Sequence, residues 1–503
     1  MKRFIDNLNK KQFTYNLFLI LIFFLGIFIR TKLYVIKGVF EDDDCRLALA
    51  MFDKNLLQMF QPLGPFSSTP IFLFFSKIIA NITNYNEYAL FIIPLFASIL
   101  GMFFFFKLSL EYFHKNSSIL IANFLFSINF ELINFSVVFK HYSTEVLVTI
   151  LCLYYFPKID LCNIKFKQCI ILSIILAILP LISLPSLFII GIFIIDNLYK
   201  NFRNKMFYKN LAITCIPFCI LTTLYYIYNL FPTKAMQYSY YENFWSNVFS
   251  VNIINVFASF IHYVYYPNPI IICHLIIIIL FIITVCCFKK NRTTFDIYIL
   301  MFFILIILAH ILNLYPIYGR CTLYAVPIFI LMCIKTYDSI NKNKILLSLI
   351  SLILISGFIC YLMPSYYIAI IKNTDKAFIK YSPKKMLMAI QKDFNPDTDM
   401  IIINGASAYC FIFYNQKLNF NTNKFAILKY DENNKIKKEN DFKQLNSLNP
   451  NKKYWFYLIK EYFDTPERIY IQEWLEKQNI KLMNQEYRSY LYYIIPPYKY
   501  VNP

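Results

Sequence analysis

Residues 15–46 read YNLFLILIFFLGIFIRTKLYVIKGVFEDDDCR, an apolar run followed by four successive carboxylates and an arginine. About 20 apolar residues are enough for a helix to cross the hydrocarbon core of a bilayer. The run continues into Arg30 and Lys32 without a small-residue cleavage site, so we expect a retained anchor and not a removed signal peptide. The stretch therefore predicts a membrane protein with an acidic segment at the outer mouth of its first span.

The composition of the whole chain agrees with this prediction. Its 503 residues are 58% hydrophobic and 16% charged, against about 45–50% apolar and about 25% charged in soluble domains. This balance excludes a disordered chain and a small disulfide scaffold, and it argues against a soluble enzyme. The net charge of +20 is spread in small groups along the chain. Because phosphate binding needs clustered Lys and Arg, no nucleic-acid partner is expected.

Apolar runs recur along the chain and predict about eleven membrane spans. They lie at 15–36, 87–107, 118–137, 142–157, 168–181, 185–199, 210–231, 269–288, 296–314, 321–335 and 344–363. The region 168–199 is open between one kinked helix and two short ones, because Pro180 and Pro185 interrupt it.

The placement of basic residues predicts the orientation of these spans. With the N-terminus in the cytoplasm, nineteen Lys and Arg lie on that side of the membrane and seven on the other, up to residue 363. Short cytoplasmic connections carry such an excess in membrane proteins. An odd number of spans then places the chain after residue 363 outside.

The last part of the chain, residues 364–503, differs in composition and predicts a separate extracytoplasmic domain. Strands are expected at 400–403, 455–459, 480–486 and 489–495, and helices at 383–394, 406–415 and 466–478. Alternating elements of this kind predict a small α/β domain. The domain organisation is therefore an all-α multi-span domain over 1–363, with a first outer loop at 37–86, and an α/β domain over 364–503.

The acidic run in the first outer loop is the first candidate site. Neighbouring carboxylates repel one another unless a cation, a proton or a positive site uses them. A helical period follows at Leu47, Ala50, Met51, Lys54, Leu57 and Gln58. Asp43 and Asp44 are thus expected near a helix N-terminus, where anions are favoured. A solvated helix cap and a functional site are both compatible with this pattern.

Two further groups lie at predicted outer ends of spans. The segment Phe139–Glu145, FKHYSTE, holds Lys140 and Glu145, and ionisable residues at membrane depth are functional candidates. Interfacial snorkelling of Lys140 and Tyr142 is the alternative. Residues 315–327, YPIYGRCTLYAVP, hold Arg320 at an outer helix start, where a lipid-headgroup anchor is the simpler explanation.

The 13 cysteines show no CxxC pair and no metal-ligand spacing, and most lie inside predicted spans as apolar filler. Cys45 and Cys410 lie outside the spans and form no obvious pair. No metal site is predicted from this pattern, although the acidic run could hold a divalent cation.

Together these stretches resemble the GT-C class of membrane glycosyltransferases that use polyprenyl-phosphate sugars. The resemblance is to the bacterial branch similar to protein O-mannosyltransferases and lipid A aminoarabinose transferases. The matching stretches are Asp43-Asp44-Cys45-Arg46, Pro62-Leu63, Pro70–Leu73, Lys140–Glu145, and the set Tyr315, Pro316, Arg320 and Pro327. The family has Glu where this chain has Asp44, so the key carboxylate matches Asp42, Asp43 or Asp44. A Gln common before the second Pro is replaced near Ser67, and Leu90-Phe91 stands where Leu-Arg is common.

The resemblance implies a glycosyltransferase of the bacterial inner membrane that transfers a sugar, with inversion, from a polyprenyl-phosphate donor at the outer face. No nucleotide cofactor is implied. The acceptor is a protein, lipid or glycan hydroxyl, and membrane lipids surround the enzyme. Such transfer needs a base for the acceptor hydroxyl and cations for the departing phosphate. The roles expected are Asp43 as base with Asp44 as partner, Lys140 and Arg320 at the phosphate, His141 and Arg46 in reserve, and Tyr142 and Glu145 in support. The alternative is a multispan transporter or lipid or glycan flippase, which usually carries repeat symmetry and midplane charges.

Overall fold

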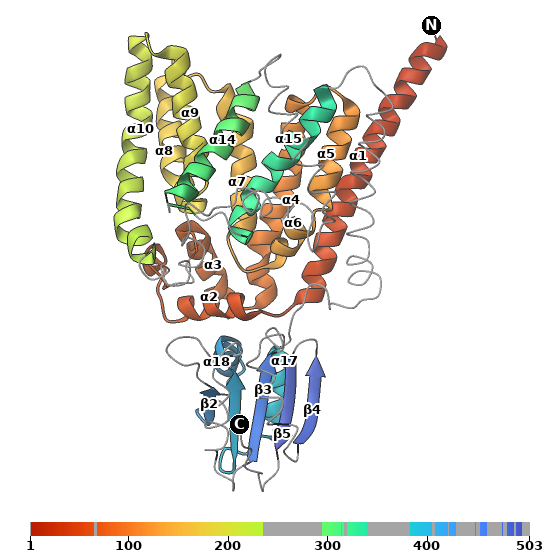
Figure 1. Cartoon of the computed structure of the whole chain (residues 1–503), viewed down its shortest axis with the longest axis vertical. Helices are drawn as coiled ribbons and strands as arrows, with labels where there is room; N and C mark the ends of the chain where they lie inside the picture. Colours follow the sequence, from red (N-terminus) through yellow and green to blue (C-terminus); the bar gives the residue numbers. More distant parts are fainter. Residues whose placement is uncertain are drawn as a thin grey trace.

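The structure is a computed structural model with two parts, a bundle of helices and a sheet domain at one end of it (Figure 1). It describes residues 2–64, 68–234, 294–339, 383–428, 453–459, 480–486 and 489–494, with residues 448 and 475 and without 313, 316–318, 405–407 and 421. The predicted spans at 269–288 and 344–363 lie outside these residues, as does the predicted helix at 466–478 apart from residue 475.

The described part of the bundle consists of α-helices joined by short turns. The α-helices are α1 (Lys2–Lys37), α2 (Asp42–Phe52), α3 (Pro70–Thr83), α4 (Glu87–Tyr112), α5 (Asn116–Ser127), α6 (Phe130–Asn134), α7 (Tyr142–Tyr155), α8 (Phe166–Ile182), α9 (Ser186–Asn201), α10 (Lys205–Tyr225), α14 (Thr294–Ile311) and α15 (Val326–Ser339). The 3₁₀ turns are η1 (Leu57–Phe60), η2 (Phe135–Val137), η3 (Phe156–Lys158) and η5 (Gly319–Ala325), and η4 (Tyr226–Leu230) is a π-helical turn.

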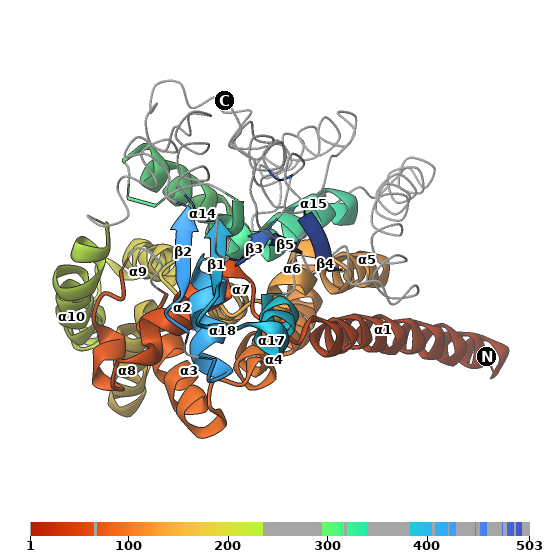
Figure 2. The same ribbon diagram turned by 90° about the horizontal axis from the view of Figure 1, so that it is seen from below.

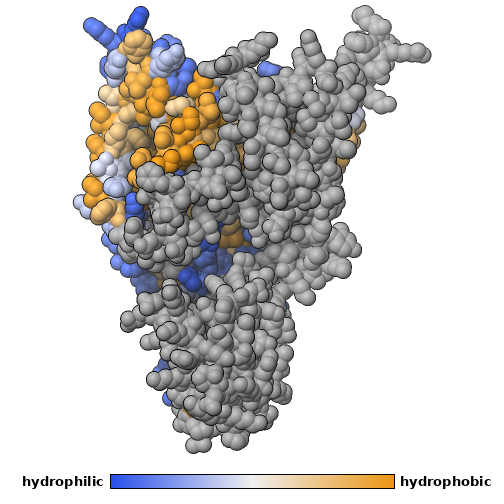
Figure 3. All heavy atoms as spheres, in the orientation of Figure 1, coloured by the Kyte–Doolittle hydropathy of each residue, from blue (hydrophilic) through white to orange (hydrophobic). Residues whose placement is uncertain are grey.

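Several of these helices are long and apolar enough to cross a membrane. Four qualify alone, at Phe13–Lys37, Glu87–Tyr112, Lys205–Lys234 and Thr294–Ile311, and a fifth qualifies if α5 and the segment Phe130–Val137 form one bent span. Apolar residues cover the flank of the bundle that carries α8 and α10, as expected for a surface that faces lipid (Figure 3). The chain is thus a multi-pass membrane protein, and the total of eleven spans stays a prediction.

The open question at 168–199 has a definite answer, because the structure has two helices there. Pro180 lies inside α8, which ends at Ile182, and Pro185 is the N-cap of α9. A proline has no N–H to donate, so it fits a helix start better than a helix interior.

The predicted span at 118–137 is broken. α5 and the segment Phe130–Val137 are bent by 51°, and Asn129 caps α6 by accepting from the backbone N–H of Leu132 at 3.0 Å. Arg30 of α1, which is fully buried, donates to the backbone oxygen of Ser127 at 2.7 Å and to Ser98 at 2.8 Å. Because lipid offers no hydrogen-bond partner, a carbonyl freed by a helix break needs a partner of this kind.

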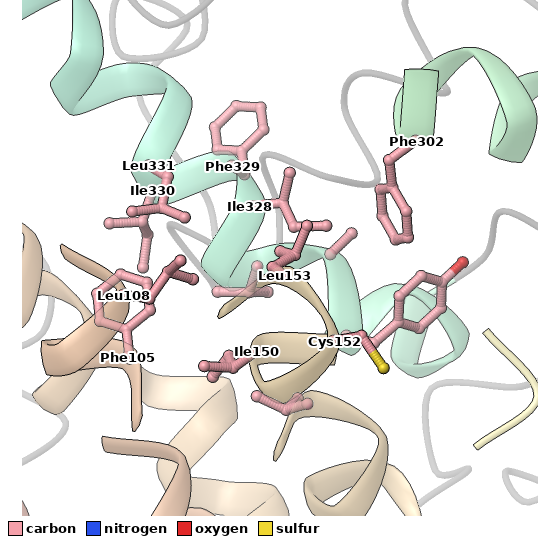
Figure 4. Close-up of a cluster of buried hydrophobic side chains, with 14 of the residues drawn as sticks. Phe105, Leu108, Ile150, Cys152, Leu153, Phe302, Ile328, Phe329, Ile330 and Leu331 are labelled. Atoms are coloured by element: carbon pink, nitrogen blue, oxygen red, sulfur yellow. The ribbon is translucent and has the colours of Figure 1, made fainter. Parts of the chain in front are cut away.

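The core of the bundle is apolar and joins helices from both ends of its sequence (Figure 4). Phe105 of α4, Ile150 of α7, Phe302 of α14 and Ile328 of α15 are all buried within one cluster. Lipid tails are as apolar as these side chains, so close packing and interhelical hydrogen bonds are what hold such a bundle together. One such bond joins Tyr112 of α4 to Asp296 of α14 at 2.8 Å.

In its described residues, the C-terminal part is a five-stranded mixed sheet with two helices. Its elements are α17 (Pro383–Asp393), β1 (Asp399–Asn404), α18 (Ala408–Lys417), β2 (Phe425–Leu428), β3 (Lys453–Ile459), β4 (Ile480–Glu486) and β5 (Ser489–Ile494). The strand order is β2-β1-β3-β5-β4, with β1 parallel to β2 and β3, and β5 antiparallel to β3 and β4. The consecutive buried residues Ile401–Ile403 fit a central parallel strand. The strand β2 is an element that the sequence analysis missed.

The C-terminal part docks on the end of the bundle that carries α2. Viewed from that end, α18 lies over α2 and α17 lies near α4 (Figure 2), and α18 packs directly against α2. One apolar cluster spans the junction and includes Phe40 and Phe91 of the bundle and Phe413 and Trp455 of the sheet domain. The acidic loop is therefore enclosed between the membrane helices and the C-terminal domain.

Candidate active site

The acidic run forms the first turn of α2, as predicted. The helix begins at Asp42 and ends at Phe52, so the predicted period to Gln58 is too long. Asn55 and Gln58 explain the end of α2, because their side chains accept from each other's backbone N–H at 2.9 and 3.0 Å and start the separate turn η1. Three carboxylates in a first helical turn are favoured by the positive end of the helix dipole.

The three aspartates do not form one anionic cluster, because each faces a different cation. Asp42 pairs with Arg46 one turn later at 2.6 Å, Asp43 pairs with Arg320, and Asp44 lies 3.6 Å from the Lys37 ammonium. Each pairing offsets the repulsion that makes the run costly in the sequence. The three carboxylates can therefore have separate roles.

Asp43 and Arg320 form the accessible pair. Their side chains are 31% and 38% exposed, and one Arg320 nitrogen donates to Asp43 Oδ2. Burial alone would raise the pKa of Asp43, but the guanidinium of Arg320 and the ammonium of Lys140 outweigh it, so the pKa lies below its ordinary value. The pair brings the first outer loop together with η5, the start of a late predicted span.

Asp44 is a buried anchor. Its side chain accepts from the backbone N–H of Phe139 at 2.7 Å and of Glu41 at 3.1 Å, and it faces Lys37, which is also buried. Only 1–2% of the two side chains is exposed. Asp44 thus fixes α2 against the segment that carries Lys140, and it has little access to a substrate.

Lys140 is buried near the accessible pair, close enough for its charge to act on Asp43. Burial lowers the pKa of Lys140, and the charge of Asp43 opposes this effect. Its backbone N–H donates to Val138 at 2.7 Å, which makes a tight turn before α7. Lys140 and Arg320 therefore both lie near Asp43, and the three residues come from three separate parts of the chain.

His141 has a different environment from the one expected of a cationic ligand. Its Nδ1 lies 2.5 Å from the Ser68 hydroxyl, and its Nε2 lies 3.6 Å from the Glu145 carboxylate. Burial, Lys140 and Arg320 together lower the pKa of His141 to about 3, so the imidazole is neutral at physiological pH. A neutral imidazole can hydrogen-bond a ligand but cannot supply positive charge.

Tyr142 and Glu145, which were expected in a supporting role, lie next to Arg320 and His141 respectively. Tyr142 places its ring 6.0 Å from the Arg320 guanidinium and packs edge-on against Phe135. Glu145 is buried in α7 and accepts a hydrogen bond from the backbone of Leu184. The segment Phe139–Glu145 therefore lies near Asp43 and Arg320.

Arg46 contributes positive charge near Asp43 and Lys140, but its direct contacts lie elsewhere. Besides Asp42, its guanidinium contacts the ring of Tyr409 in the C-terminal domain, 4.4 Å from the ring centroid. Its position fits a contact between domains better than a phosphate contact. Arg46 is the one predicted site residue that the structure directs towards the C-terminal domain.

A polar contact that the sequence analysis missed holds the C-terminal domain in place. The carboxylate of Glu87, at the start of α4, accepts from Lys417 at 2.5 Å, from Tyr414 at 3.1 Å and from Lys384 at 3.2 Å. The Tyr414 hydroxyl also accepts from the backbone N–H of Phe40 at 2.9 Å. Glu87 gave no signal, because a single Glu before an apolar run reads as an ordinary helix start.

Within the described residues, no group of three His, Cys, Asp or Glu side chains is arranged to hold a metal ion. The pairing of the aspartates explains why the acidic run is not such a group. The divalent cation considered from the sequence therefore has no ligand set among the described side chains.

The architecture has counterparts among solved structures. ArnT from Cupriavidus metallidurans bound to undecaprenyl phosphate aligns with a TM-score of 0.50 and 8% identity, over 96% of this chain and 98% of that chain. The Archaeoglobus fulgidus oligosaccharyltransferase in complex with Zn and sulfate aligns with a TM-score of 0.51 and 12% identity, over 88% of this chain and 68% of that chain. Both are GT-C glycosyltransferases. The chain has a GT-C-like fold.

By sequence, no family model and no curated protein matches the chain. The likeness to GT-C proteins thus lies in the fold, and it agrees with the resemblance drawn from the ordered motifs. The alignment with ArnT extends over the C-terminal domain as well as the bundle, since it covers nearly the whole of both chains.

Proposed function

We propose that the chain is a membrane glycosyltransferase that moves a sugar from a polyprenyl-phosphate donor to an acceptor hydroxyl at the outer face of the membrane. One observation carries the proposal: the accessible Asp43–Arg320 pair lies at one end of an apolar GT-C-like bundle, with Lys140 buried near it. A carboxylate and two cations in one place are the groups that this reaction needs.

The pair supports a specific sequence of events. The donor phosphate takes Arg320 and Lys140 as its partners, and Arg320 thereby releases Asp43. With the nearby positive charge neutralised, burial dominates and the pKa of Asp43 rises, which makes its carboxylate a better base. Asp43 then accepts the proton of the acceptor hydroxyl, whose oxygen bonds to the anomeric carbon. The bond from that carbon to the phosphate oxygen breaks, and the charged phosphate leaves on Arg320 and Lys140.

The neighbouring groups are assigned by their contacts. Asp44 holds Phe139, and so Lys140, in register with α2. His141, neutral and hydrogen-bonded to Ser68, orients the turn before α7 and contributes no charge. Arg46 belongs to the contact with the C-terminal domain. The acceptor, whether protein, lipid or glycan, approaches from the exposed side of Asp43.

The test compares an aspartate in the first turn of α2 with the aspartate that caps its other end. In membranes that contain the full chain and undecaprenyl-phosphate sugars, Asp43→Asn should lower transfer by about 10²–10⁴-fold. Asp53→Asn is the matched control, since Asp53 is the exposed C-cap of α2. Mass analysis of proteins, lipid A and envelope glycans would identify the acceptor. Wild-type transfer by Asp43→Asn would show that Asp43 is not the general base. If the wild-type chain gave no glycosylated product, a transporter or flippase would be favoured.

We also propose that the C-terminal domain lies outside the cytoplasm, in the periplasm of a bacterial inner membrane. The excess of Lys and Arg at the opposite end of the spans supports this orientation. A phosphatase reporter that is active only outside, fused after Pro503, should be active. A cytoplasmic reporter active at the same position would reverse the orientation.

A further inference from the structure

Two cysteines meet where the C-terminal domain docks on α2. Cys45 follows the acidic run on α2, and Cys410 lies in the first turn of α18. Their thiols are hydrogen-bonded to each other, and both side chains are fully buried. Both cysteines are free in the structure, and their contact adds to the sequence analysis, which found no obvious pair. Their spacing in the sequence could not reveal the contact, because it depends on the docking of one domain on another.

The contact lies next to the candidate catalytic residues and to the interface between the two domains. Cys45 is two residues from Asp43 and follows Asp44 directly, and Cys410 is next to Tyr409, which stacks on Arg46. The two cysteines share one apolar cluster with Leu47. A covalent link here would join the candidate catalytic helix to the C-terminal domain.

We propose that Cys45 and Cys410 are the site of a disulfide that fixes the C-terminal domain to α2. The inference depends on the outer location of this junction, and it is independent of the transfer reaction. Disulfides form and persist in the bacterial periplasm, where the proposed orientation places both residues. Two packed helices with touching thiols can meet the separation of about 4.4–6.8 Å between Cα atoms that a disulfide requires.

The bond forms by thiol–disulfide exchange with a protein disulfide of that compartment. One cysteine thiolate attacks a sulfur of the oxidant, which gives a mixed disulfide and releases one oxidant thiol. The second cysteine thiolate then attacks the first cysteine sulfur, forms the Cys45–Cys410 bond and displaces the second oxidant thiol. The two cysteines lose two electrons and two protons, and the oxidant's two sulfurs receive them.

The burial of the two thiols determines when the disulfide can form. Burial raises the pKa of the Cys45 thiol well above its ordinary value and also raises that of Cys410, so both are protonated once the domain is docked. A protonated thiol is a poor nucleophile. Exchange therefore takes place during folding, before the docking is complete, and the buried bond then resists reduction in the native protein.

The direct test is a peptide map of the full chain. The chain is expressed in a bacterial inner membrane, denatured with excess N-ethylmaleimide and no reductant, and digested with trypsin. The expected product is peptide 38–46, GVFEDDDCR, linked to peptide 393–417, which contains Cys410. Reduction should separate the two. Recovery of both peptides as maleimide adducts, or of either linked to another cysteine, would overturn the proposal.

A second measurement uses variants. The thermal midpoint of the wild type should fall when reductant is present during unfolding, because the reduced chain loses the constraint of a long closed loop. The variant Cys45→Ala/Cys410→Ala should show no such dependence. Cys152→Ala is the matched control, since Cys152 is buried in α7 away from the junction and should keep the wild-type response. Equal midpoints with and without reductant in the wild type would contradict the disulfide.

Both tests are separate from the transferase assay. A linked peptide together with absent transfer would support the disulfide and refute the proposed enzyme activity. Transfer together with unlinked cysteine peptides would support the enzyme activity and refute the disulfide.

Discussion

Two of the three ion pairs of the acidic run differ in exposure although their aspartates are adjacent. The Asp43–Arg320 side chains are 31% and 38% exposed, whereas 2% of Asp44 and 1% of Lys37 are exposed. The buried pair also accepts two backbone N–H bonds, through Asp44. One carboxylate can therefore meet a substrate, and the other holds two segments together. The difference separates a chemical role from a structural one within a single helical turn.

The largest effect on stability should come from breaking the buried pair. Asp44→Asn leaves Lys37 charged and buried without a counter-ion, which costs about 3–5 kcal/mol. The expected result is a low folded yield and a lower midpoint of thermal unfolding in detergent. The double variant Lys37→Met/Asp44→Asn should recover much of the loss, because it removes the unpaired charge.

The opposite outcome would exchange the roles of the two aspartates. A variant Asp44→Asn with wild-type stability and no transfer would make Asp44 the base, one position from the residue we assign.

An intermediate effect is expected at the cation near the accessible pair. Lys140→Ala should raise the KM for the lipid donor by about 10–100-fold, since a charge-assisted hydrogen bond contributes about 1.5–3 kcal/mol. The KM for the acceptor should change less. Arg46→Ala is the matched control, because its guanidinium faces Tyr409 and Asp42. Equal donor effects in both variants would mean that the phosphate lies between the two cations, and an acceptor defect alone would contradict the role of Lys140.

The smallest effect should be a shift of the pH profile. Cations hold the pKa of Asp43 below its ordinary value, so its charged form is present above that lowered pKa and is lost as the pH falls through it. Arg320→Gln removes the strongest of these cations, and burial then raises the pKa. The acid limb of kcat/KM should move to higher pH in this variant and move less in Arg46→Gln, because Arg46 lowers the pKa of Asp43 less than Arg320 does. An unmoved limb in Arg320→Gln would show that the limb does not report Asp43.

Much of the fold could be predicted because local patterns determine it. Apolar length predicts α4 and α14, and Asn395-Pro396-Asp397 together with the run Met400–Ile403 predicts the turn and strand after α17. The break between α5 and α6 was not predicted, since it depends on Arg30 from another helix. The strand β2 was missed because it is only four residues long and lies at the edge of the sheet.

The candidate site, like the fold, could be predicted only in part from the sequence. Asp43, Lys140 and Arg320 were chosen for their order along the chain, and the structure brings them together. Which aspartate is accessible could not be predicted, because one position along a helix turns a side chain by about 100°. The contact of Ser68 was missed because its partner His141 is distant in sequence, and that of Lys37 was missed because Asp44 lies across the turn between α1 and α2.

The buried Arg30 has a consequence for biogenesis. A membrane protein is made from its N-terminus, so α1 enters the bilayer before the broken segment of α5 and α6 emerges. The guanidinium is then already in place to receive the Ser127 carbonyl when that segment arrives. The first helix would thus act as a template for the insertion of a bent span, and the turn that carries Lys140, which follows directly, would take its position from that early step.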